Sequence, residues 1–234
     1  TKTMTDANNN AVTDTPEYVL AIPRTELTNN GWGYGVHDFD VDKIDPINFA
    51  FLPRDWADDK TPGHDEPNKL GQIMPQVLPY IIVKNEHGDI LSYRRKGKEK
   101  GLLGRYSIGV GGHVDITDGI YGDDAINILQ GVGPYSHNIH HIIQVGLMRE
   151  LEEEIGLTIK EPVSFHTLVQ LDSDKTSQVH VAFVGTVIAP EHILTTCNPN
   201  EFFEVEWVSS EELFERIQDM DYEPWSKALI NWFN

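Results

Sequence analysis

The chain has 234 residues, of which 39% are hydrophobic and 24% charged, and this is enough apolar content for the core of a globular protein. It carries 18 lysines and arginines against 37 aspartates and glutamates, which gives a formal net charge of −19. This balance disfavours nucleic acid or an anionic membrane as the main partner, because both select broad basic surfaces. A small phosphorylated ligand is compatible with it, since such a ligand needs only a local cluster of cations.

The ends and the cysteine content favour an intracellular protein. The first 16 residues are rich in Asn and Thr, predict a flexible tail, and lack the apolar segment of a signal peptide. The single cysteine, Cys197, can form no intramolecular disulfide. No apolar run approaches the ~18 residues of a membrane span. We therefore expect a soluble, cytoplasmic protein that does not associate with membranes.

The part of the chain before residue 76 predicts little regular structure. Residues 17–27, EYVLAIPRTEL, have the apolar pattern of a strand, in which Pro23 indicates an edge or a bend. From residue 29 to residue 71 the sequence is loop-like, with glycines, prolines and aromatic residues. We predict that residues 17–75 form an N-terminal extension that serves as a lid or as an arm of a homodimer.

Regular structure is predicted from residue 76 onward. Residues 76–97 have the pattern of two strands joined by a turn, in which Gly88 supplies a positive φ. A short strand then runs into the glycine-rich segment GVGGH, and an irregular stretch follows at 119–138. The other expected elements are a helix at 139–155, a hairpin of strands at 163–171 and 179–189, a strand at 201–209, and helices at 209–220 and 224–233.

The predicted helix at 139–155 ends in a concentration of acids. Glu150, Glu153 and Glu154 fall on one face of it, because residues three and four apart are neighbours on a helix. Met148, Leu151 and Ile155 fall on the other face. Such carboxylates repel by about 0.2–0.5 kcal/mol per pair, and anions near the carboxyl end of a helix cost about 0.3–1 kcal/mol each. A hard cation such as Mg²⁺ or Mn²⁺ would convert this repulsion into attraction. A solvated acidic surface is the other interpretation that the charges leave open.

The residues around these acids resemble the Nudix box. Residues 149–157, RELEEEIGL, fit its second half, Arg-Glu-apolar-x-Glu-Glu-x-Gly-apolar, at every fixed position. Gly112 and Asp118 resemble its first half, a glycine followed six positions later by an acid. The chain departs from the pattern because that acid is usually Glu, and because an insertion at about 119–138 separates the two halves. The sequence thus resembles a Nudix hydrolase with an interrupted box.

This resemblance covers residues 76–234 and implies an α+β fold, an α/β/α sandwich around a mixed β-sheet, here with an N-terminal extension. It implies a Mg²⁺- or Mn²⁺-dependent hydrolase that cleaves the diphosphate linkage of a nucleoside diphosphate joined to another moiety, by attack of a metal-activated water. One alternative is an inactive Nudix-fold protein that binds a nucleotide or regulates a partner. Another is a structural assembly protein that uses residues 17–71 as its contact arm.

The resemblance also implies roles for individual residues. Glu153 and Glu154 would be metal ligands, and Glu150 would be a ligand or would orient the water. Arg149 would position a glutamate by an ion pair. The backbone carbonyl of Gly112, or of the preceding glycine, would complete the metal site.

Other candidates lie outside the helix. The family often supplies a further glutamate from a loop before a tryptophan, and Glu201 fits this position best, with Glu204 as second choice. Asp118 would contact Arg149, although its shorter side chain and the insertion put that role in question. The basic segment before the glycines predicts contacts to substrate phosphates, and so does the histidine after them. The residues that we assign to this group are Arg94, Arg95, Arg105 and His113.

Overall fold

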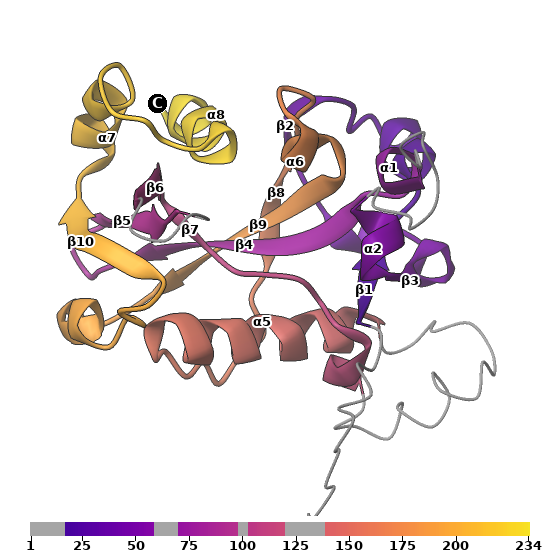
Figure 1. The fold of residues 1–234 in the computed structure, drawn as a ribbon, viewed down its shortest axis with the longest axis horizontal. Helices are drawn as coiled ribbons and strands as arrows, with labels where there is room; N and C mark the ends of the chain where they lie inside the picture. The colour runs from indigo at the N-terminus through magenta and orange to yellow at the C-terminus, as the bar shows by residue number, and fades with distance from the viewer. Residues whose placement is uncertain (1–16, 59–69, 98–102, 120–138) are drawn as a thin grey trace, which may run out of the picture.

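A mixed β-sheet lies between helices in the computed structural model, which describes residues 17–58, 70–97, 103–119 and 139–234. Helix α5 (Ile139–Ile155) covers one face of the sheet, and α7 (Ser210–Arg216) and α8 (Pro224–Phe233) cover the other (Figure 1). This arrangement confirms the predicted α+β sandwich. The predicted tail at 1–16 and most of the predicted insertion, residues 120–138, lie outside the described residues.

The sheet is mixed because one central pair of strands is parallel. Its main path runs β10-β5-β4-β9-β8-β2. These strands are Phe202–Val208 (β10), Ile90–Lys96 (β5), Gln76–Lys84 (β4), His180–Ile188 (β9), Phe165–Gln170 (β8) and Gly35–Asp38 (β2). Strands β4 and β9 are parallel from the pair Gln76–His180 to the pair Lys84–Ile188, whereas the other neighbours on this path are antiparallel.

Shorter strands extend this path. Strand β1 (Tyr18–Ala21) pairs with β3 (Ala50–Pro53) and reaches β4 through the pair Ala21–Gln76. Strand β6 (Leu103–Ser107) pairs with β5, and β7 (Gly109–Val110) pairs with β4. Residues before 76 therefore add strands to the same sheet. The division into an extension and a domain, and the lid or dimer role of the extension, stay predictions.

The segment before residue 76 is more regular than we expected. The strand predicted at 17–27 is wrong beyond Ala21, because Pro23 is followed by helix α1 (Arg24–Asn29). Proline has no N–H for a strand ladder but a φ suited to the residue before a helix. The loop-like interpretation of 29–71 is wrong where β2 and β3 form. The short helices of this segment are Val41–Lys43 (η1), Pro46–Asn48 (η2), Arg54–Ala57 (α2) and Leu70–Ile73 (α3).

Successive side chains of the central strands point to opposite faces of the sheet, and this divides the core into two layers. Ile81 packs with the cluster under α5, whereas Ile82 packs with the cluster under α7 and α8. Leu151 and Ile155 of α5 are fully buried, as the helix pattern predicts, but Met148 is 37% exposed. The position of Met148 on the apolar face was thus predicted wrongly. Burial of each large apolar side chain contributes about 1.5–3 kcal/mol, so α5 is held to the sheet mainly by its inner face.

The later elements follow the sequence closely. Helix α5 has the predicted bounds and ends at Gly156, whose φ of 69° suits a glycine after a helix. Helix α7 starts where Ser209 accepts the N–H of Glu212 at 3.2 Å, but it ends at Arg216 and is shorter than expected. The remaining short helices are Ile116–Gly119 (η3), Lys175–Gln178 (α6) and Glu191–Thr195 (η4). Among the described residues, no helix combines the length and the hydropathy needed to cross a bilayer.

Candidate active site

The acidic residues of α5 lie where the glycine segment after β7 passes the helix (Figure 1). Their exposure differs: the side chain of Glu150 is 15% exposed, that of Glu153 is 61% exposed, and Glu154 is partly buried. The buried Leu151 fixes the rotation of this part of the helix, so the three acids keep to its other side. The structure thus brings the predicted glutamates against the predicted glycine segment.

Two glycines allow the chain to approach these acids closely. A β-carbon on Gly112 would lie 2.5 Å from Oε1 of Glu150, which is shorter than any normal contact. Inside α5, a β-carbon on Gly146 would lie 2.8 Å from Oδ2 of Asp118. A side chain at either position would therefore displace a carboxylate of the site, although neither glycine has a positive φ. The close approach leaves Gly112 beside the carboxylate with which it would share a metal ion.

Arg149 joins the two halves of the interrupted box. Its Nε donates to Oδ1 of Asp118 at 2.7 Å, and its Nη2 donates to Oδ2 at 3.1 Å. The other terminal nitrogen, Nη1, lies 3.0 Å from Oε1 of Glu150 and 3.4 Å from Oε2 of Glu153. Asp118 is only 3% exposed and also accepts the backbone N–H of Asp115 at 2.9 Å. The contact between Asp118 and Arg149 therefore forms despite the insertion and the shorter acid.

The electrostatic environment opposes full ionisation of the acids. Burial raises the pKa of Glu154 to about 7, and the Glu150 and Glu201 carboxylates add to the effect while Arg95 opposes it. Burial also raises the pKa of Glu150, although the Arg149 guanidinium lowers it. The hydrogen bonds that Arg149 donates to Asp118 raise the pKa of Arg149. Burial and the neighbouring carboxylates therefore both disfavour the charged forms of Glu150 and Glu154.

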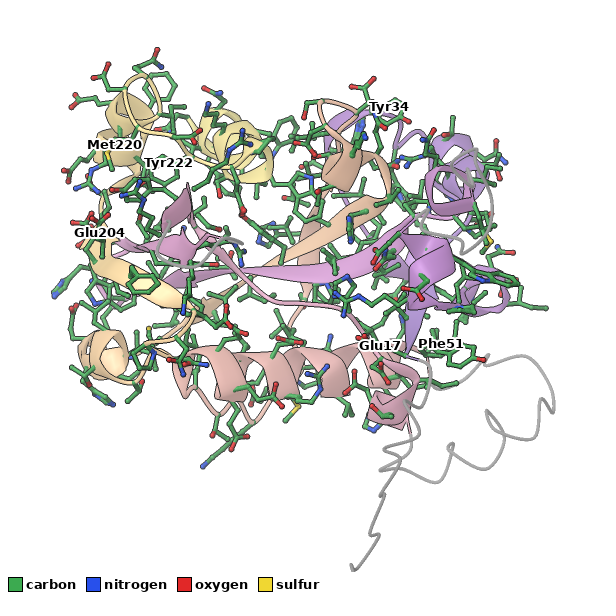
Figure 2. The ribbon with its side chains drawn as sticks, viewed as in Figure 1. Glu17, Tyr34, Phe51, Glu204, Met220 and Tyr222 are labelled. Atoms are coloured by element: carbon green, nitrogen blue, oxygen red, sulfur yellow. The ribbon has the colours of Figure 1, made fainter. Side chains whose placement is uncertain are left out.

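The two glutamates proposed as further site residues lie in different surroundings. Glu201 acts on Glu154 electrostatically, and its loop is tied to the end of α5, because Asn198 donates its N–H to the carbonyl of Glu154 at 2.8 Å. Glu204 lies at the edge of the sheet, on the side of Tyr222 (Figure 2), where it accepts the hydroxyl of Tyr106. It has a φ of 48° at the irregularity of β10. The structure thus places Glu201 nearer the acids.

The three predicted arginines are not equivalent. Arg94 lies over the ring of Tyr106, at 5.1 Å from its centroid, and donates from Nε to the carbonyl of Gly104 at 2.9 Å. Arg105 pairs with Asp221 at 3.4 Å and is 54% exposed. Arg95 pairs with Phe202 of β10, next to Glu201, and its charge lowers the pKa of Glu154. Among these three residues, Arg95 is therefore the one associated with the acidic cluster.

His113 contributes its backbone more clearly than its ring. Its carbonyl accepts from Nη2 of Arg149 at 3.3 Å, whereas its ring Nε2 lies 3.4 Å from Nε2 of His180. Burial lowers the pKa of His113 to about 3, and the charges of His180 and Arg54 lower it further. The ring is therefore neutral near pH 7. A neutral ring that faces another histidine gives little support to the predicted phosphate contact.

One acid beside these residues was not predicted. Glu223 immediately precedes α8, and its Oε2 accepts from Nε of Arg95 at 3.2 Å. The signal in the sequence is an acid before Pro224, which is typical of the start of a helix. That signal predicts a contact within the helix and says nothing of an arginine far away in the chain.

The donor set fits a hard divalent cation in its chemistry. Carboxylate oxygens and a backbone carbonyl are the ligands that Mg²⁺ and Mn²⁺ prefer, and burial and the neighbouring carboxylates raise the pKa of Glu154, an effect that a bound cation would oppose. Within the part of the chain that the structure describes, however, no three acidic, histidine or cysteine side chains are already arranged to hold a metal ion. Binding would require carboxylates to turn toward a common point.

Comparison with known proteins supports the same relationship. The family profile of the NUDIX domain matches residues 140–233. The crystal structure of Tm1382, a proposed Nudix hydrolase, superposes with a TM-score of 0.63 at 22% identity, over 93% of this chain and 98% of that one. DR0079 from Deinococcus radiodurans gives a TM-score of 0.43 at 18% identity, over 67% of this chain and 81% of that one. The MutT protein from Methanosarcina mazei Go1 gives 0.40 at 21% identity, over 66% and 88%.

The profile and the fold agree on the assignment. A comparison with curated protein sequences gives no match. The profile nevertheless includes Glu150, Glu153 and Glu154 of α5, and the likeness to the fold of Tm1382 extends over nearly the whole chain, including most of the part before residue 140. The profile thus identifies a NUDIX domain at residues 140–233, which contains the complete second half of the box at 149–157, and the likeness to Tm1382 shows the fold.

Proposed function

We propose that the chain is a Mg²⁺- or Mn²⁺-dependent hydrolase that cleaves the diphosphate linkage of a nucleoside diphosphate joined to another moiety. The observation that carries this proposal is the acidic end of α5, where Glu150 lies against Gly112 and is followed by Glu153 and Glu154. The nearby Arg149 is already bound by Asp118 and cannot neutralise all of it. A divalent ion would neutralise the remaining carboxylates, and the phosphates of a substrate would complete its coordination.

Each residue has a definite task in this proposal. Glu153 and Glu154, with the carbonyl of Gly112, hold the cation, and Glu150 completes the set or orients the attacking water. When bound, the ion lowers the pKa of a water molecule and neutralises charge on the phosphoryl oxygens. Arg149 maintains Glu150 and Glu153 in position through its hydrogen bonds. Positioning and electrostatic stabilisation account for most of the catalysis of such reactions.

Glu201 is our candidate for the general base. A base must reach the proton that it removes, directly or through one water molecule. Glu201 is exposed and close enough to influence Glu154, whereas Glu204 is engaged by Tyr106 and Arg94. We therefore prefer Glu201 over Glu204, and a Glu201→Gln variant should lose turnover while it keeps its metal affinity.

The deciding experiment is a metal-dependent turnover assay. The purified protein is incubated with a panel of nucleoside diphosphate conjugates, in Mg²⁺, in Mn²⁺ or in EDTA, and the products are separated by ion-exchange chromatography. We expect cleavage at the diphosphate of at least one compound with either metal and none in EDTA. Absence of cleavage for every compound, or cleavage that is unaffected by EDTA, would contradict the proposal.

A binding protein without catalysis is the second candidate. The observation that favours it is that the described acids are not prearranged as a metal site and that Glu150 is tied to Arg149. Under this alternative, a nucleotide would bind tightly without being cleaved. Calorimetry on the same panel of compounds separates the two candidates, because tight binding in Mg²⁺ without product identifies a binder.

A further inference from the structure

The acid that precedes α8 is held rigidly against the sheet. The backbone N–H of Glu223 donates to the carbonyl of Tyr106 at 2.8 Å, and the N–H of Tyr106 donates to the carbonyl of Asp221 at 2.9 Å. The hydroxyl of Tyr222 lies 2.7 Å from Oγ of Ser92 in β5, and Figure 2 shows Tyr222 above the strands at the same end of the sheet as β10. The start of α8 is therefore fixed to β5 and β6 independently of the side chain of Glu223.

The carboxylate of Glu223 is the centre of a buried hydrogen-bond network. Its Oε1 accepts from the hydroxyls of Tyr80 at 2.5 Å, Ser107 at 2.6 Å and Ser226 at 3.4 Å. Tyr80 is 4% exposed, and both serines are fully buried. Burial raises the pKa of Tyr80 well above its ordinary value, and the charge of Glu223 adds to this effect, so the tyrosine remains a donor. These hydroxyls hold the carboxylate of Glu223 in one orientation.

The other carboxylate oxygen of Glu223, Oε2, accepts a hydrogen bond from Arg95. Nε of Arg95 lies 3.2 Å from Oε2, and the guanidinium carbon lies 5.4 Å from the centroid of the Tyr93 ring. Among the described residues, neither terminal nitrogen of Arg95 has a hydrogen-bond acceptor, and the side chain is 41% exposed. Arg95 pairs with Phe202 across β5 and β10, next to Glu201, so it lies beside the loop whose Asn198 N–H donates to the carbonyl of Glu154 at 2.8 Å. The end of the guanidinium is thus charged, accessible and unpartnered within the described chain.

We propose that Glu223 is a positioning residue for Arg95. It binds Nε and leaves Nη1 and Nη2 to donate together to a phosphate of the diphosphate substrate, a geometry that a planar guanidinium provides and an ammonium group does not. This inference rests on the proposed function for the identity of the ligand. It assigns to the start of α8, on the opposite face of the sheet from α5, a role in binding that ligand.

The competing explanation is that Glu223 only docks α8. The Glu223→Gln variant separates the two roles, because the amide oxygen still accepts from the hydroxyls of Tyr80 and Ser107 while the amide nitrogen faces Nε of Arg95 and cannot accept from it. The docking of α8 is thus largely preserved and the hold on Arg95 is lost. Glu206→Gln is the matched control, since it removes a different carboxylate that pairs with Arg216 in another part of the fold.

The experiment is a double-mutant cycle on the binding of methylenediphosphonate, a diphosphate analogue that cannot be hydrolysed, measured by calorimetry in MgCl₂. We expect Arg95→Ala to weaken binding about tenfold and Glu223→Gln about threefold, as befits a charge-assisted contact and its support. In the Arg95→Ala background, Glu223→Gln should have no further effect. Glu206→Gln should bind as the wild type does.

Two results would overturn the inference. The first is a loss from Glu223→Gln that is as large without Arg95 as with it, because the acid would then act independently of the arginine. The second is wild-type affinity in either single variant, with thermal unfolding confirming that each is folded. The cycle measures binding and not turnover, so it can be interpreted even where the wild-type protein hydrolyses no compound. Absence of hydrolysis would contradict the proposed function alone.

Discussion

At Glu154, burial and three neighbouring acids raise the pKa of one carboxyl group. Its pKa is about 7 in the folded protein against an ordinary value of 4.5, so between these values the folded state holds a proton that the unfolded state releases. The metal-free protein should therefore lose stability as pH rises from about 4.5 to about 7, and no further through this group above that range. Glu150, whose pKa is also raised, contributes in the same sense.

The Glu154→Gln variant tests this dependence. Without the titrating group, the decline of stability between pH 5 and pH 8 in EDTA should become shallower, and the variant should exceed the wild type at pH 8 by on the order of 1 kcal/mol, after allowance for solvent screening. Urea unfolding at several pH values measures the free energy of unfolding of the variant and of the wild type. An unchanged pH profile would show that burial and the neighbouring acids do not raise the pKa of this carboxyl group.

Glu153 offers a second test at the same scale, with a control one residue away. Glu153→Gln should reduce metal-dependent turnover by at least about 100-fold, because it removes a proposed ligand, and should leave the fold intact, since the side chain is 61% exposed. Glu152→Gln removes the same charge from an exposed neighbour that has no proposed role. Equal losses in the two variants would indicate a general effect of charge and not coordination.

At the scale of elements, the approach of the glycine segment to α5 makes a sharp prediction. In Gly112→Ala the new methyl group would lie 2.5 Å from Oε1 of Glu150, so the segment or the carboxylate must shift. We expect turnover to fall about tenfold or more, because displacements of about 1 Å in a catalytic site have effects of this order. Gly33→Ala is the control, since a β-carbon there has no neighbour within 4 Å. Steady-state kinetics of the two variants, with melting temperatures, measures the difference.

Elements with strong local patterns were predicted correctly, and those that depend on remote partners were not. Helix α5 has both an apolar stripe and a terminal glycine, and its bounds agree with the structure. Strands β2 and β3 have four residues each and exist because β8 and β1 pair with them. No local signal marks such short strands, so they were missed.

The same distinction applies to the candidate site. The Arg-Glu-Glu pattern of α5 is contiguous and was readable from the sequence, whereas the contact between Asp118 and Arg149 crosses the insertion and could only be suggested. The pairing of Glu223 with Arg95 joins β5 to the residue before α8, and no local pattern in the sequence predicts it. Likewise, only the fold shows that Arg94 and Arg105 are engaged by Tyr106 and Asp221.

For the whole molecule, the net charge of −19 means that any cation will have some effect on stability. A specific site adds to this, because a ligand that binds only the folded state stabilises it by RT ln(1 + [L]/Kd). We expect 10 mM MgCl₂ to raise the melting temperature by a few degrees more than NaCl of equal ionic strength, since about 1 kcal/mol corresponds to ~2–4 °C for a chain of this size. The excess should vanish in a Glu153→Gln, Glu154→Gln double variant. An equal effect of both salts would mean that only screening is at work.

The parallel ladder between β4 and β9 has a consequence for how the protein is made. Gln76 pairs with His180, and Lys84 pairs with Ile188. The centre of the sheet therefore cannot form until the chain has been synthesised through α5 and β9. Pairing of such distant segments slows folding, and until it occurs the apolar side of α5 has nothing to cover it. A nascent chain halted before β9 should consequently depend on chaperones, and one halted after α8 should not.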